Sequence, residues 1–514
     1  MPKAKVYFVG GGPGDAGLIT VKGVDALKEA DVIIYDFLVN KKLLGHAKKG
    51  AETIYAGKKG RFKHISQGKI NALIIKNAKK GKTVVRLKGG DPWIFGRGAE
   101  EALALVKKGI PFEVIPGVTS ATAVPLYAGI PLTHRDFSSA VIFLTGQESP
   151  EKEISGVEWE KVARHGTLVI LMGWKNLSAI VKKLIENGRP GETPVAIIRW
   201  GTLAKQRCVT GRLEGIVSLA KKEGILPPVV IVVGDIVRLR EKLNWFEKKP
   251  LFGKRVLVTR TLEQAGVFTK LLEEYGAEPV VFPTIRIVPP RSWKPVDKAI
   301  MRLKGYDCAI FTSANGVKYF FERLYNLGRD VRELKGVKIC AIGPATSFAI
   351  EERGIRVDVT PEKFRAEAIL DALGKRDIKG KNFLLPRAER AREVLPEEIR
   401  KLGGKIDVVT VYRTIKPVKE TKELKKLLAD RAVDVVTFTS SSTVENFISL
   451  GKKTEIKRLL KGVTVACIGP ITKGTAEKYG FKVDIMPEEY TIPALAEAMA
   501  RHFGKKARTR NFQS

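Results

Sequence analysis

Glycine-dense segments that follow short apolar runs are the parts of this sequence best suited to chemistry. The segment GGGPGDAG (residues 10–17) follows the apolar run Val6–Val9 and contains the pattern GxGxxG, and Asp36 ends the next apolar run. After a strand, this pattern is typical of dinucleotide binding, so a nicotinamide cofactor is one hypothesis. Pro13 lacks the N–H that a phosphate-binding turn uses, and the helical pattern begins only near Thr20. A tight glycine turn without a ligand is the other interpretation.

Two further segments combine glycine with polar residues. The segment VVRLKGGDPWIFGRG (residues 84–98) predicts a strand, a long loop and the start of a helix. Such a loop at the carboxyl end of a strand lets backbone groups approach a flat ligand closely. The segment PGVTSA (residues 116–121) places Thr119 or Ser120 at a helix N-terminus. Simple N-capping by these hydroxyls is the alternative to ligand binding.

The elements that must position these loops follow an α/β pattern. Short apolar runs alternate with helix-length segments such as 100–108 and 177–187, which end at Gly109 and Gly188, and this alternation predicts mostly parallel sheets. The predicted strands are Val6–Val9, Val32–Tyr35, Val84–Leu87, Val141–Leu144, Leu168–Met172, Val195–Ile198 and Val229–Val233. A charged segment with a proline, 239–253, separates this half from a new strand start at Lys254.

The second half contains an internal repeat at an offset of 126 to 127 residues, which predicts two similar lobes. The repeated pairs are FTS 311–313 with 438–440, IGP 342–344 with 468–470, Gly276 with Gly403, and Arg286 with Arg413. Each copy carries a strand-like stretch, Val280–Val288 and Val408–Ile415. We expect these two stretches to pair as a connector and to leave a substrate cleft between the lobes.

Composition limits the class of protein. Of 514 residues, 44% are hydrophobic and 28% charged, which is typical of a globular chain and excludes general disorder. The 91 Lys and Arg against 55 Asp and Glu give a net charge of +36, which favours anionic partners. Four scattered cysteines argue against a disulfide framework and a metal site, so a reducing, cytoplasmic location is expected. No apolar stretch is long enough to predict a secretion leader or a membrane span.

Several long motifs in order resemble the uroporphyrinogen-III C-methyltransferase family of tetrapyrrole methylases, over about residues 3–246. They are VGGGPGDAGLIT, YDFLV, VRLKGGDPWIFGRG, PGVTSA, AGIPLTHRD, LMGW, RWGT and GDIVRLREKLNWF. The resemblance implies S-adenosylmethionine, in place of a nicotinamide, as the ligand of the glycine loops. By position, its implied contacts are Pro13, Gly89, Gly90, Asp91, Ile94, Thr119, Ser120, Met172 and Gly201.

The same resemblance implies two catalytic residues. Asp36, in YDFLV, is the implied proton acceptor, and Lys58 is the implied proton donor. A solvated lysine beside Lys59 and Arg61 is the alternative for Lys58. Arg97 and Arg135 are expected to bind substrate carboxylates, because guanidinium groups grip carboxylates at two points.

The second half, about 254–505, resembles uroporphyrinogen-III synthase through its repeat, FTSANGVKYFF, FTSSSTVENF, the two IGP turns and the TVYRT of the second connector. The resemblance implies cyclisation of hydroxymethylbilane with inversion of ring D and no cofactor. Loop residues suited to donating hydrogen bonds to the substrate are Ser313, Asn315, Ser440, Ser441, Ser442 and Thr472. Tyr412 is the nominated proton donor, with packing in the connector as its alternative. Ile471 stands where the family usually has a threonine.

Together these features predict a bifunctional α/β enzyme that makes precorrin-2 from hydroxymethylbilane, with methylation at C2 and C7, for siroheme or cobalamin. The expected domains are 1–248, with lobes at about 1–115 and 116–248, and 249–514. In the latter, lobe one is about 254–280 plus 416–505 and lobe two about 290–408. A homodimer through the methylase half is expected, since that family is dimeric. An RNA methylase anchored by the basic segment 505–510 is the rival, disfavoured because basic residues are not interleaved with aromatic ones.

Overall fold

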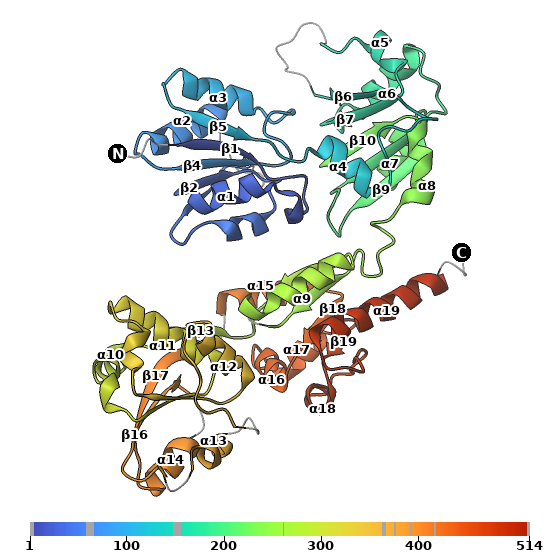
Figure 1. Cartoon of the computed structure of the whole chain (residues 1–514). Helices are drawn as coiled ribbons and strands as arrows, with labels where there is room; N and C mark the ends of the chain where they lie inside the picture. Colours follow the sequence, from blue (N-terminus) through green and yellow to red (C-terminus); the bar gives the residue numbers. More distant parts are fainter. Residues whose placement is uncertain are drawn as a thin grey trace. The chain divides into compact units, whose positions relative to one another are not determined.

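A computed structural model of the chain describes residues 5–57, 66–147, 156–260, 262–361, 366–374, 377–390, 393–415 and 418–510. The chain divides into two compact units. One comprises residues 1–256, 267–280 and 487–514, and the other comprises 257–266 and 281–486. Four β-sheets with helices packed on their faces make up the fold, so the α/β prediction is confirmed (Figure 1).

The first sheet is wholly parallel, with the order β3-β2-β4-β1-β5. Its strands are β1 (Val6–Gly10), β2 (Val32–Tyr35), β3 (Glu52–Tyr55), β4 (Val84–Lys88) and β5 (Phe112–Ile115). Helices α2 (Gln67–Ala78) and α3 (Gly98–Val106) pack on one face through an apolar cluster, and α1 (Val21–Glu29) packs on the other (Figure 1). Since all five strands run in one direction, the loops after them meet at one edge.

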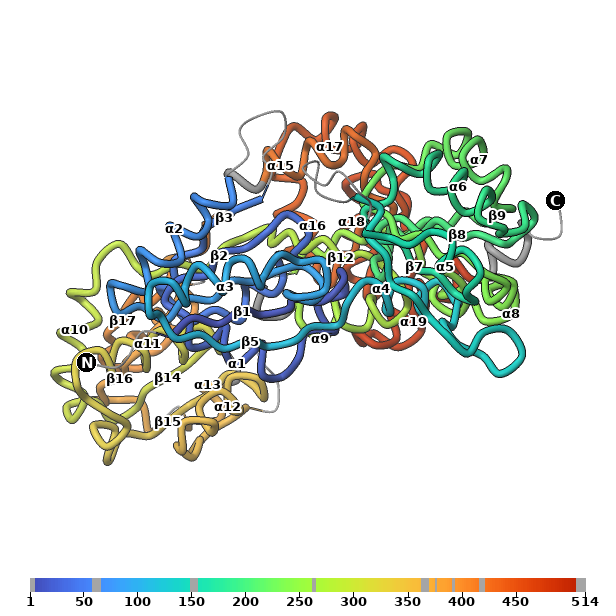
Figure 2. The backbone as a smooth tube through the Cα atoms, turned by 90° about the horizontal axis from the view of Figure 1, so that it is seen from above, coloured from blue at the N-terminus to red at the C-terminus, as the bar shows by residue number. Residues whose placement is uncertain are grey.

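The second sheet, β6-β7-β10-β8-β9, is mixed, so the expectation of mostly parallel sheets is wrong here. Its strands are β6 (Val141–Thr145), β7 (Thr167–Leu171), β8 (Pro194–Arg199), β9 (Arg207–Arg212) and β10 (Val229–Val233). β10 is antiparallel to both β7 and β8, and β8 and β9 form a hairpin. Hairpin neighbours must be antiparallel, and the alternation of apolar runs with helices did not reveal this connection. Helices α5 (Trp159–Ala163), α6 (Leu177–Glu186) and α7 (Ile216–Lys222) contact one face (Figure 2), and α4 (Ser120–Tyr127) contacts the other.

A short helix, α8 (Arg240–Leu243), precedes the third sheet, whose order is β12-β11-β18-β19. Its strands are β11 (Arg255–Val258), β12 (Glu278–Val281), β18 (Val435–Phe438) and β19 (Thr464–Cys467). The helices of this part are α9 (Leu262–Glu274), α15 (Val418–Ala429), α16 (Ser441–Ile448), α17 (Lys453–Leu459), α18 (Pro470–Lys478) and α19 (Ile492–Arg510). The sheet therefore joins residues from far apart in the chain.

The fourth sheet, β13-β17-β16-β14-β15, contains the predicted connector. Its strands are β13 (Arg286–Val288), β14 (Cys308–Phe311), β15 (Lys338–Ala341), β16 (Asn382–Ala388) and β17 (Lys405–Ile415). β13 and β17 are antiparallel, with Arg286 opposite Ile415, which confirms the pairing of the two stretches at 286–288 and 413–415. The first stretch is not one strand, however, because its start belongs to β12 in the third sheet. Helices α10 (Lys294–Met301), α11 (Ala314–Asn326) and α12 (Pro344–Glu351) contribute to one apolar cluster, and α13 (Ala366–Leu373) and α14 (Val394–Lys401) to the other.

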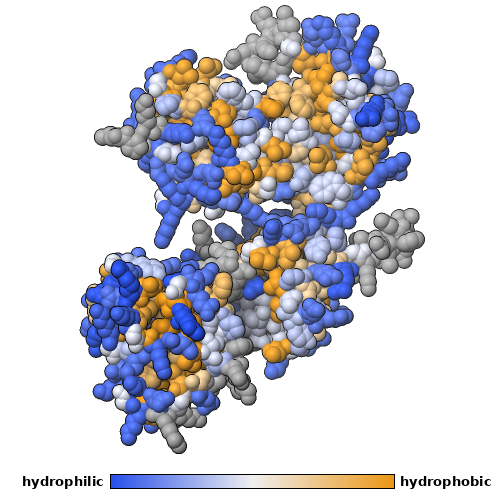
Figure 3. All heavy atoms as spheres, viewed as in Figure 1, coloured by the Kyte–Doolittle hydropathy of each residue, from blue (hydrophilic) through white to orange (hydrophobic). Residues whose placement is uncertain are grey.

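Most strand predictions agree with the structure to within one residue at either end. Met172 lies one residue outside the observed strand: β7 ends at Leu171, and Met172 has φ +56°, which a strand does not accommodate. Hydrophilic residues cover much of the surface visible in Figure 3, with hydrophobic patches among them. Within the described ranges, no helix is long and apolar enough to span a bilayer and no cluster of metal-ligating side chains occurs.

Candidate active sites

The three glycine-rich loops of the first half meet at the carboxyl edge of the parallel sheet. The N–H of Gly11 donates to the carbonyl of Lys88 over 2.7 Å, and Gly12 and Gly90 exchange backbone hydrogen bonds of 3.2 and 2.7 Å. A Cβ on Gly117 would lie 2.4 Å from the Gly90 oxygen and 2.6 Å from the Gly10 Cα. Because neither neighbour is a flexible side chain, no larger residue fits there, and we call this contact of Gly10, Gly90 and Gly117 the glycine junction.

The carboxylate of Asp91 holds the second loop in shape. One oxygen accepts hydrogen bonds from the N–H groups of Trp93 and Ile94 at 2.8 and 3.0 Å, and the other accepts from the N–H of Gly117 at 3.0 Å. Asp91 therefore links the second glycine loop to the third. The sequence predicted a ligand contact at Asp91. The motif alone did not reveal that the Asp91 carboxylate also connects two loops by hydrogen bonds.

A turn from the second sheet adjoins the first loop. The N–H of Asp15 donates to the Thr202 hydroxyl at 2.9 Å, and the Tyr127 hydroxyl donates to the Asp15 carboxylate at 2.9 Å. Burial, together with the charge of Asp15, raises the pKa of Tyr127 above its ordinary value. Pro13 and Gly201, both predicted ligand contacts, lie close in the sequence to Asp15 and Thr202. A Cβ on Gly201 would meet the Val124 side chain at 2.4 Å, so this turn too is closely packed.

Backbone strain concentrates in the same loops. Among the described residues, six that are not glycine have positive φ, and five of them follow β4, β7 or β8: Phe95, Arg97, Met172, Trp200 and Thr202. Such conformations cost free energy and persist where the surroundings impose them, often at ligand sites. Phe95 and Arg97 belong to the second glycine loop, and Trp200 and Thr202 to the turn that adjoins the first, so these four support a binding site at this edge.

The remaining predicted residues of the first half have mixed surroundings. Thr119 caps α4 by accepting from the N–H of Ala121 at 3.3 Å, and Ser120 is the first residue of that helix. Arg97 forms an exposed ion pair with Glu100 at 2.7 Å, and Arg135 is exposed. Lys58 lies outside the described residues, as do Lys59 and Arg61.

Asp36 belongs to a buried charge network that the sequence reading missed. Arg86 Nη2 lies 2.7 and 2.9 Å from the two oxygens of Asp36, and Arg86 Nε lies 2.9 Å from Glu101 Oε2. Lys88 Nζ lies 3.0 Å from Glu101 Oε1 and 3.7 Å from Asp36 Oδ2, and the Gln67 amide donates to Glu101 at 2.9 Å. The available signal was the presence of Arg86 and Lys88 within a strand otherwise made of Val and Leu.

Burial and charge act against each other in this network. Burial alone would lower the pKa of Arg86 and raise that of Glu101, but their opposite charges outweigh it, so the pKa of Arg86 is raised and that of Glu101 lowered. For Lys88, burial and the neighbouring Arg86 lower the pKa. The opposite charges of Arg86 and Glu101 therefore favour their ionised forms despite their burial.

In the second half, the structure brings Ser313 and Tyr412 together. Their hydroxyls lie 3.2 Å apart, while Ser313 also caps α11 by accepting from the N–H of Gly316 at 3.0 Å. The Tyr412 ring stacks on Tyr319 with centroids 6.0 Å apart. Tyr412 thus packs in the connector, as the alternative interpretation expected, and its hydroxyl still faces the predicted substrate loop at Ser313. Asn315, in the first turn of α11, is half-buried.

The equivalent loop of the third sheet gathers the other predicted hydroxyls. Ser440 caps α16, and its hydroxyl lies 2.9 Å from that of Ser442. Thr475, which was not predicted, donates to the Ser441 hydroxyl at 2.9 Å and so links α16 to α18. Thr472 is buried, whereas Ile471 is 81% exposed.

Two arginines at repeat-related positions were also missed. Arg260 follows β11 and Arg387 lies near the end of β16, and they are 127 residues apart, the offset of the repeat. Arg387 pairs with Glu393. Among the described residues, Arg260 Nε is buried without a hydrogen-bond partner, and burial lowers the pKa of Arg260. Comparing the two copies beyond their loop motifs would have found this pair.

Comparison with known proteins matches a different family to each half of the sequence. The model for tetrapyrrole (corrin/porphyrin) methylases matches residues 5–217, and the model for uroporphyrinogen-III synthase HemD matches 266–497. The porphyrin biosynthesis protein HemD of Ruminiclostridium josui is 37% identical over 494 residues, which is 96% of this chain and 97% of that protein. The chain belongs to both families, one in each half. It is a bifunctional enzyme of tetrapyrrole biosynthesis.

The methylase half has further relatives. The S-adenosyl-L-methionine-dependent uroporphyrinogen III methyltransferase of Methanosarcina barkeri is 50% identical over 241 residues, covering 47% of this chain and 94% of that protein. The crystal structure of uroporphyrin-III C-methyl transferase from Thermus thermophilus complexed with S-adenyl homocysteine is 38% identical and covers 46% of this chain and 94% of that chain, with a TM-score of 0.40.

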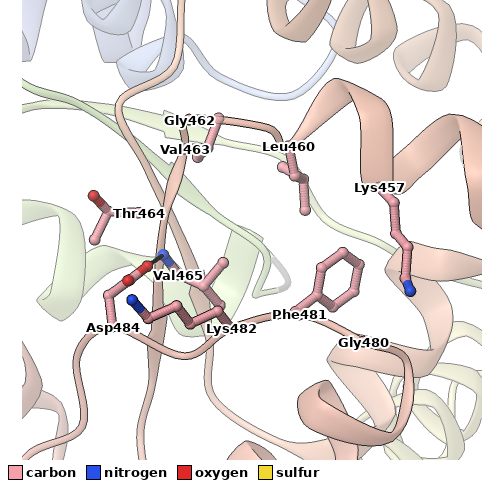
Figure 4. Close-up of a pocket in the computed structure, with 10 residues that line it drawn as sticks. All are labelled: Lys457, Leu460, Gly462, Val463, Thr464, Val465, Gly480, Phe481, Lys482 and Asp484. Atoms are coloured by element: carbon pink, nitrogen blue, oxygen red, sulfur yellow. Dashed lines mark hydrogen bonds between the residues drawn. The ribbon is translucent and has the colours of Figure 1, made fainter.

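A pocket in the described part of the synthase half lies away from its predicted loops. A pocket of about 380 Å³ surrounds the amino end of β19 and is lined by Lys457, Lys482 and Asp484 among others (Figure 4). The Asp484 carboxylate there accepts from the N–H of Val465 at 3.0 Å, which occupies it structurally. The predicted serines instead lie after the carboxyl ends of β14 and β18, where α11 and α16 begin, and Thr472 lies in α18 after the carboxyl end of β19.

Proposed function

We propose that the methylase half transfers methyl groups from S-adenosylmethionine to C2 and C7 of uroporphyrinogen III. The observation that carries this proposal is the glycine junction, where three glycine-rich loops meet at the carboxyl edge of a parallel sheet, the edge at which such sheets bind their ligands. The Methanosarcina barkeri relative, named for its dependence on S-adenosyl-L-methionine, supports the choice of ligand. When bound, that ligand supplies an electrophilic methyl group.

The residues of this chain then mainly bind and orient. Asp91 is proposed to hold the loops in place. The residues proposed to contact the methyl donor are Pro13, Gly89, Gly90, Ile94, Thr119, Ser120, Met172 and Gly201. Arg97 and Arg135 are proposed to bind substrate carboxylates. Because the pyrrole carbon must approach in line with the methyl–sulfur bond, orientation accounts for most of the rate. Asp36, 27% exposed in its side chain, is the proposed acceptor of the proton that the macrocycle releases, and Lys58 the proposed donor.

We propose that the synthase half cyclises hydroxymethylbilane to uroporphyrinogen III with inversion of ring D and without a cofactor. This reaction needs a proton for the departing hydroxyl and donors for many carboxylates. The Tyr412 hydroxyl, 3.2 Å from that of Ser313, is the proposed proton donor. The residues proposed to position the substrate are Asn315, Ser440, Ser441, Ser442, Thr472, Arg260 and Arg387.

The product of the synthase half is the substrate of the methylase half, which gives one chain two consecutive steps towards precorrin-2. Siroheme or cobalamin is the proposed destination, and a homodimer through the methylase half the proposed assembly. A nicotinamide at the glycine junction and an RNA substrate remain the rival activities, and each predicts a different ligand for the purified chain.

The deciding experiment is incubation of the whole chain with hydroxymethylbilane, with and without S-adenosylmethionine, followed by identification of the tetrapyrroles. We expect unmethylated uroporphyrinogen III without the donor and a dimethylated product with it. Asp36→Ala should slow formation of the dimethylated product at least about 100-fold and preserve the first result, because cyclisation uses other residues. Formation of the same product in both reactions, or of uroporphyrinogen I alone, would contradict the proposal.

A further inference from the structure

Asp36 is the exposed end of an otherwise buried network. Arg86 and Glu101 are each 1% exposed and Lys88 is 5% exposed, whereas the Asp36 side chain is 27% exposed. Arg86 faces both carboxylates: Nε and Nη2 contact Glu101 at 2.9 and 3.3 Å, and Nη2 also contacts both oxygens of Asp36. The guanidinium is thus anchored by Glu101 and aimed at Asp36.

Stability alone does not account for this arrangement. Replacing buried ion networks by apolar residues of similar volume is often neutral or stabilising. The neighbours of Arg86 and Lys88 on β4, Val84, Val85 and Leu87, are fully buried apolar residues. The same strand could carry apolar side chains throughout, so the charged residues have a different consequence: they determine where the Asp36 carboxylate lies.

The position of Asp36 relative to the glycine loops makes that consequence functional. Asp36 follows β2, and β2 is the direct neighbour of β4, whose loop contributes Gly90 to the glycine junction. A Cβ on Gly89 would lie 2.9 Å from the Leu38 Cβ, so the segment that carries Asp36 packs on that loop. A shift of the Asp36 carboxylate would therefore alter its distance to anything bound there.

We propose that Arg86 is a positioning residue for methyl transfer, which holds the Asp36 carboxylate at the rim of the glycine loops while Glu101 anchors Arg86 from the opposite side. This inference rests on the proposed function of the methylase half. Asp36 contacts the reacting substrate in this proposal, and Arg86 acts only through Asp36.

The test uses the whole chain and the variants Arg86→Gln, Arg86→Lys and Asp36→Ala. We expect Arg86→Gln to lower kcat of methyl transfer about 100-fold, the lower range for loss of a positioned acid or base. KM for S-adenosylmethionine and the affinity for S-adenosylhomocysteine should change by less than about threefold, because the buried Arg86 side chain is not exposed to a ligand in the loops. Arg86→Lys should recover part of kcat, since it keeps the charge.

A double variant separates positioning from structural support. If Arg86 acts through Asp36, Arg86→Gln combined with Asp36→Ala should be no slower than Asp36→Ala alone, because the effects are not additive.

The matched control is Arg189→Gln. Arg189 is also buried, but its guanidinium donates to the carbonyls of Ala163 and Gly166 at 3.0 and 2.7 Å, away from the glycine loops. A loss of kcat in Arg189→Gln equal to that in Arg86→Gln, or additive losses in the double variant, would overturn the inference. Binding of S-adenosylhomocysteine reports on folding of the methylase half, and if Arg86→Gln does not fold, Arg86→Lys with Asp36→Ala decides by the same cycle. Failure of the wild-type chain to methylate would instead overturn the proposed function.

Discussion

Glu101 provides the negative charge that two buried cations, Arg86 and Lys88, require. Replacing one member of a buried ion network leaves the others without a partner, which costs about 3–5 kcal/mol. We therefore expect Glu101→Gln to lower the free energy of unfolding of the methylase half by about that amount. Calorimetry of the whole chain should show the thermal transition of the methylase half at lower temperature and that of the synthase half unchanged.

The pH dependence of this effect has a defined sign. The pKa of Glu101 is lowered in the folded state, so its contribution to stability is present above its unfolded value of about 4.5 and is lost as the pH falls through the folded pKa. The difference between wild type and Glu101→Gln should accordingly shrink in acid. Glu186→Gln is the control, since Glu186 forms an exposed pair with Lys182 at 3.6 Å and should cost less than about 0.5 kcal/mol. A difference that grows below pH 4.5 would contradict the role of the Glu101 charge.

At the scale of elements, the glycine junction depends on loops from three strands. Gly117→Ala would bring a Cβ to 2.4 Å from the Gly90 oxygen, so the loops must separate. We expect binding of S-adenosylhomocysteine, measured by calorimetric titration, to weaken at least about tenfold while cyclisation is retained. Gly68→Ala in α2 is the matched control, because no atom lies within 4 Å of the added Cβ and alanine favours a helix. Unchanged affinity in Gly117→Ala would show that the ligand does not use this junction.

The strand ends of the synthase half give a second element-scale prediction. Arg260 follows β11, where Thr259 donates to the carbonyl of Thr437 on the neighbouring β18 at 2.7 Å. A desolvated guanidinium there favours a substrate carboxylate, and losing one charged hydrogen bond costs about 1.5–3 kcal/mol. Arg260→Gln should lower kcat/KM for cyclisation about 10- to 100-fold. Methylation of supplied uroporphyrinogen III should not change, and Arg458→Gln, an exposed arginine of the same part, should have neither effect.

For the whole molecule, the net charge of +36 predicts strong salt dependence. A polycarboxylate substrate is attracted over distances that salt screens, so kcat/KM for hydroxymethylbilane should fall about tenfold between 0.05 and 0.5 M NaCl. The value of kcat at saturation should change much less, and sucrose at matched osmolality is the control. A kcat/KM that does not respond to salt would mean that the excess charge plays no part in substrate capture.

Local regularity explains how far the sequence could predict the fold. Val32–Tyr35 and Val229–Val233 were predicted with the bounds of β2 and β10, because continuous apolar runs bounded by polar residues leave little freedom. The helix start at Thr20 was also correct, since Thr20 caps α1 by accepting from the N–H of Gly23 at 3.1 Å. The direction of β10 was not predictable, because strand direction depends on connections across the sheet and leaves no periodicity in the strand itself.

The sequence by itself determined the division of labour: the ordered motifs of the first half, the internal repeat of the second and the basic composition all depend on residue type and spacing. Only the tertiary structure decided which side chains meet. Asp36, Arg86 and Glu101 are separated by up to 65 positions along the chain, and Ser313 and Tyr412 by 99, yet each group lies within hydrogen-bonding distance. Such contacts arise because neighbouring parallel strands bring distant segments to one edge, and no local pattern in the sequence encodes that distance.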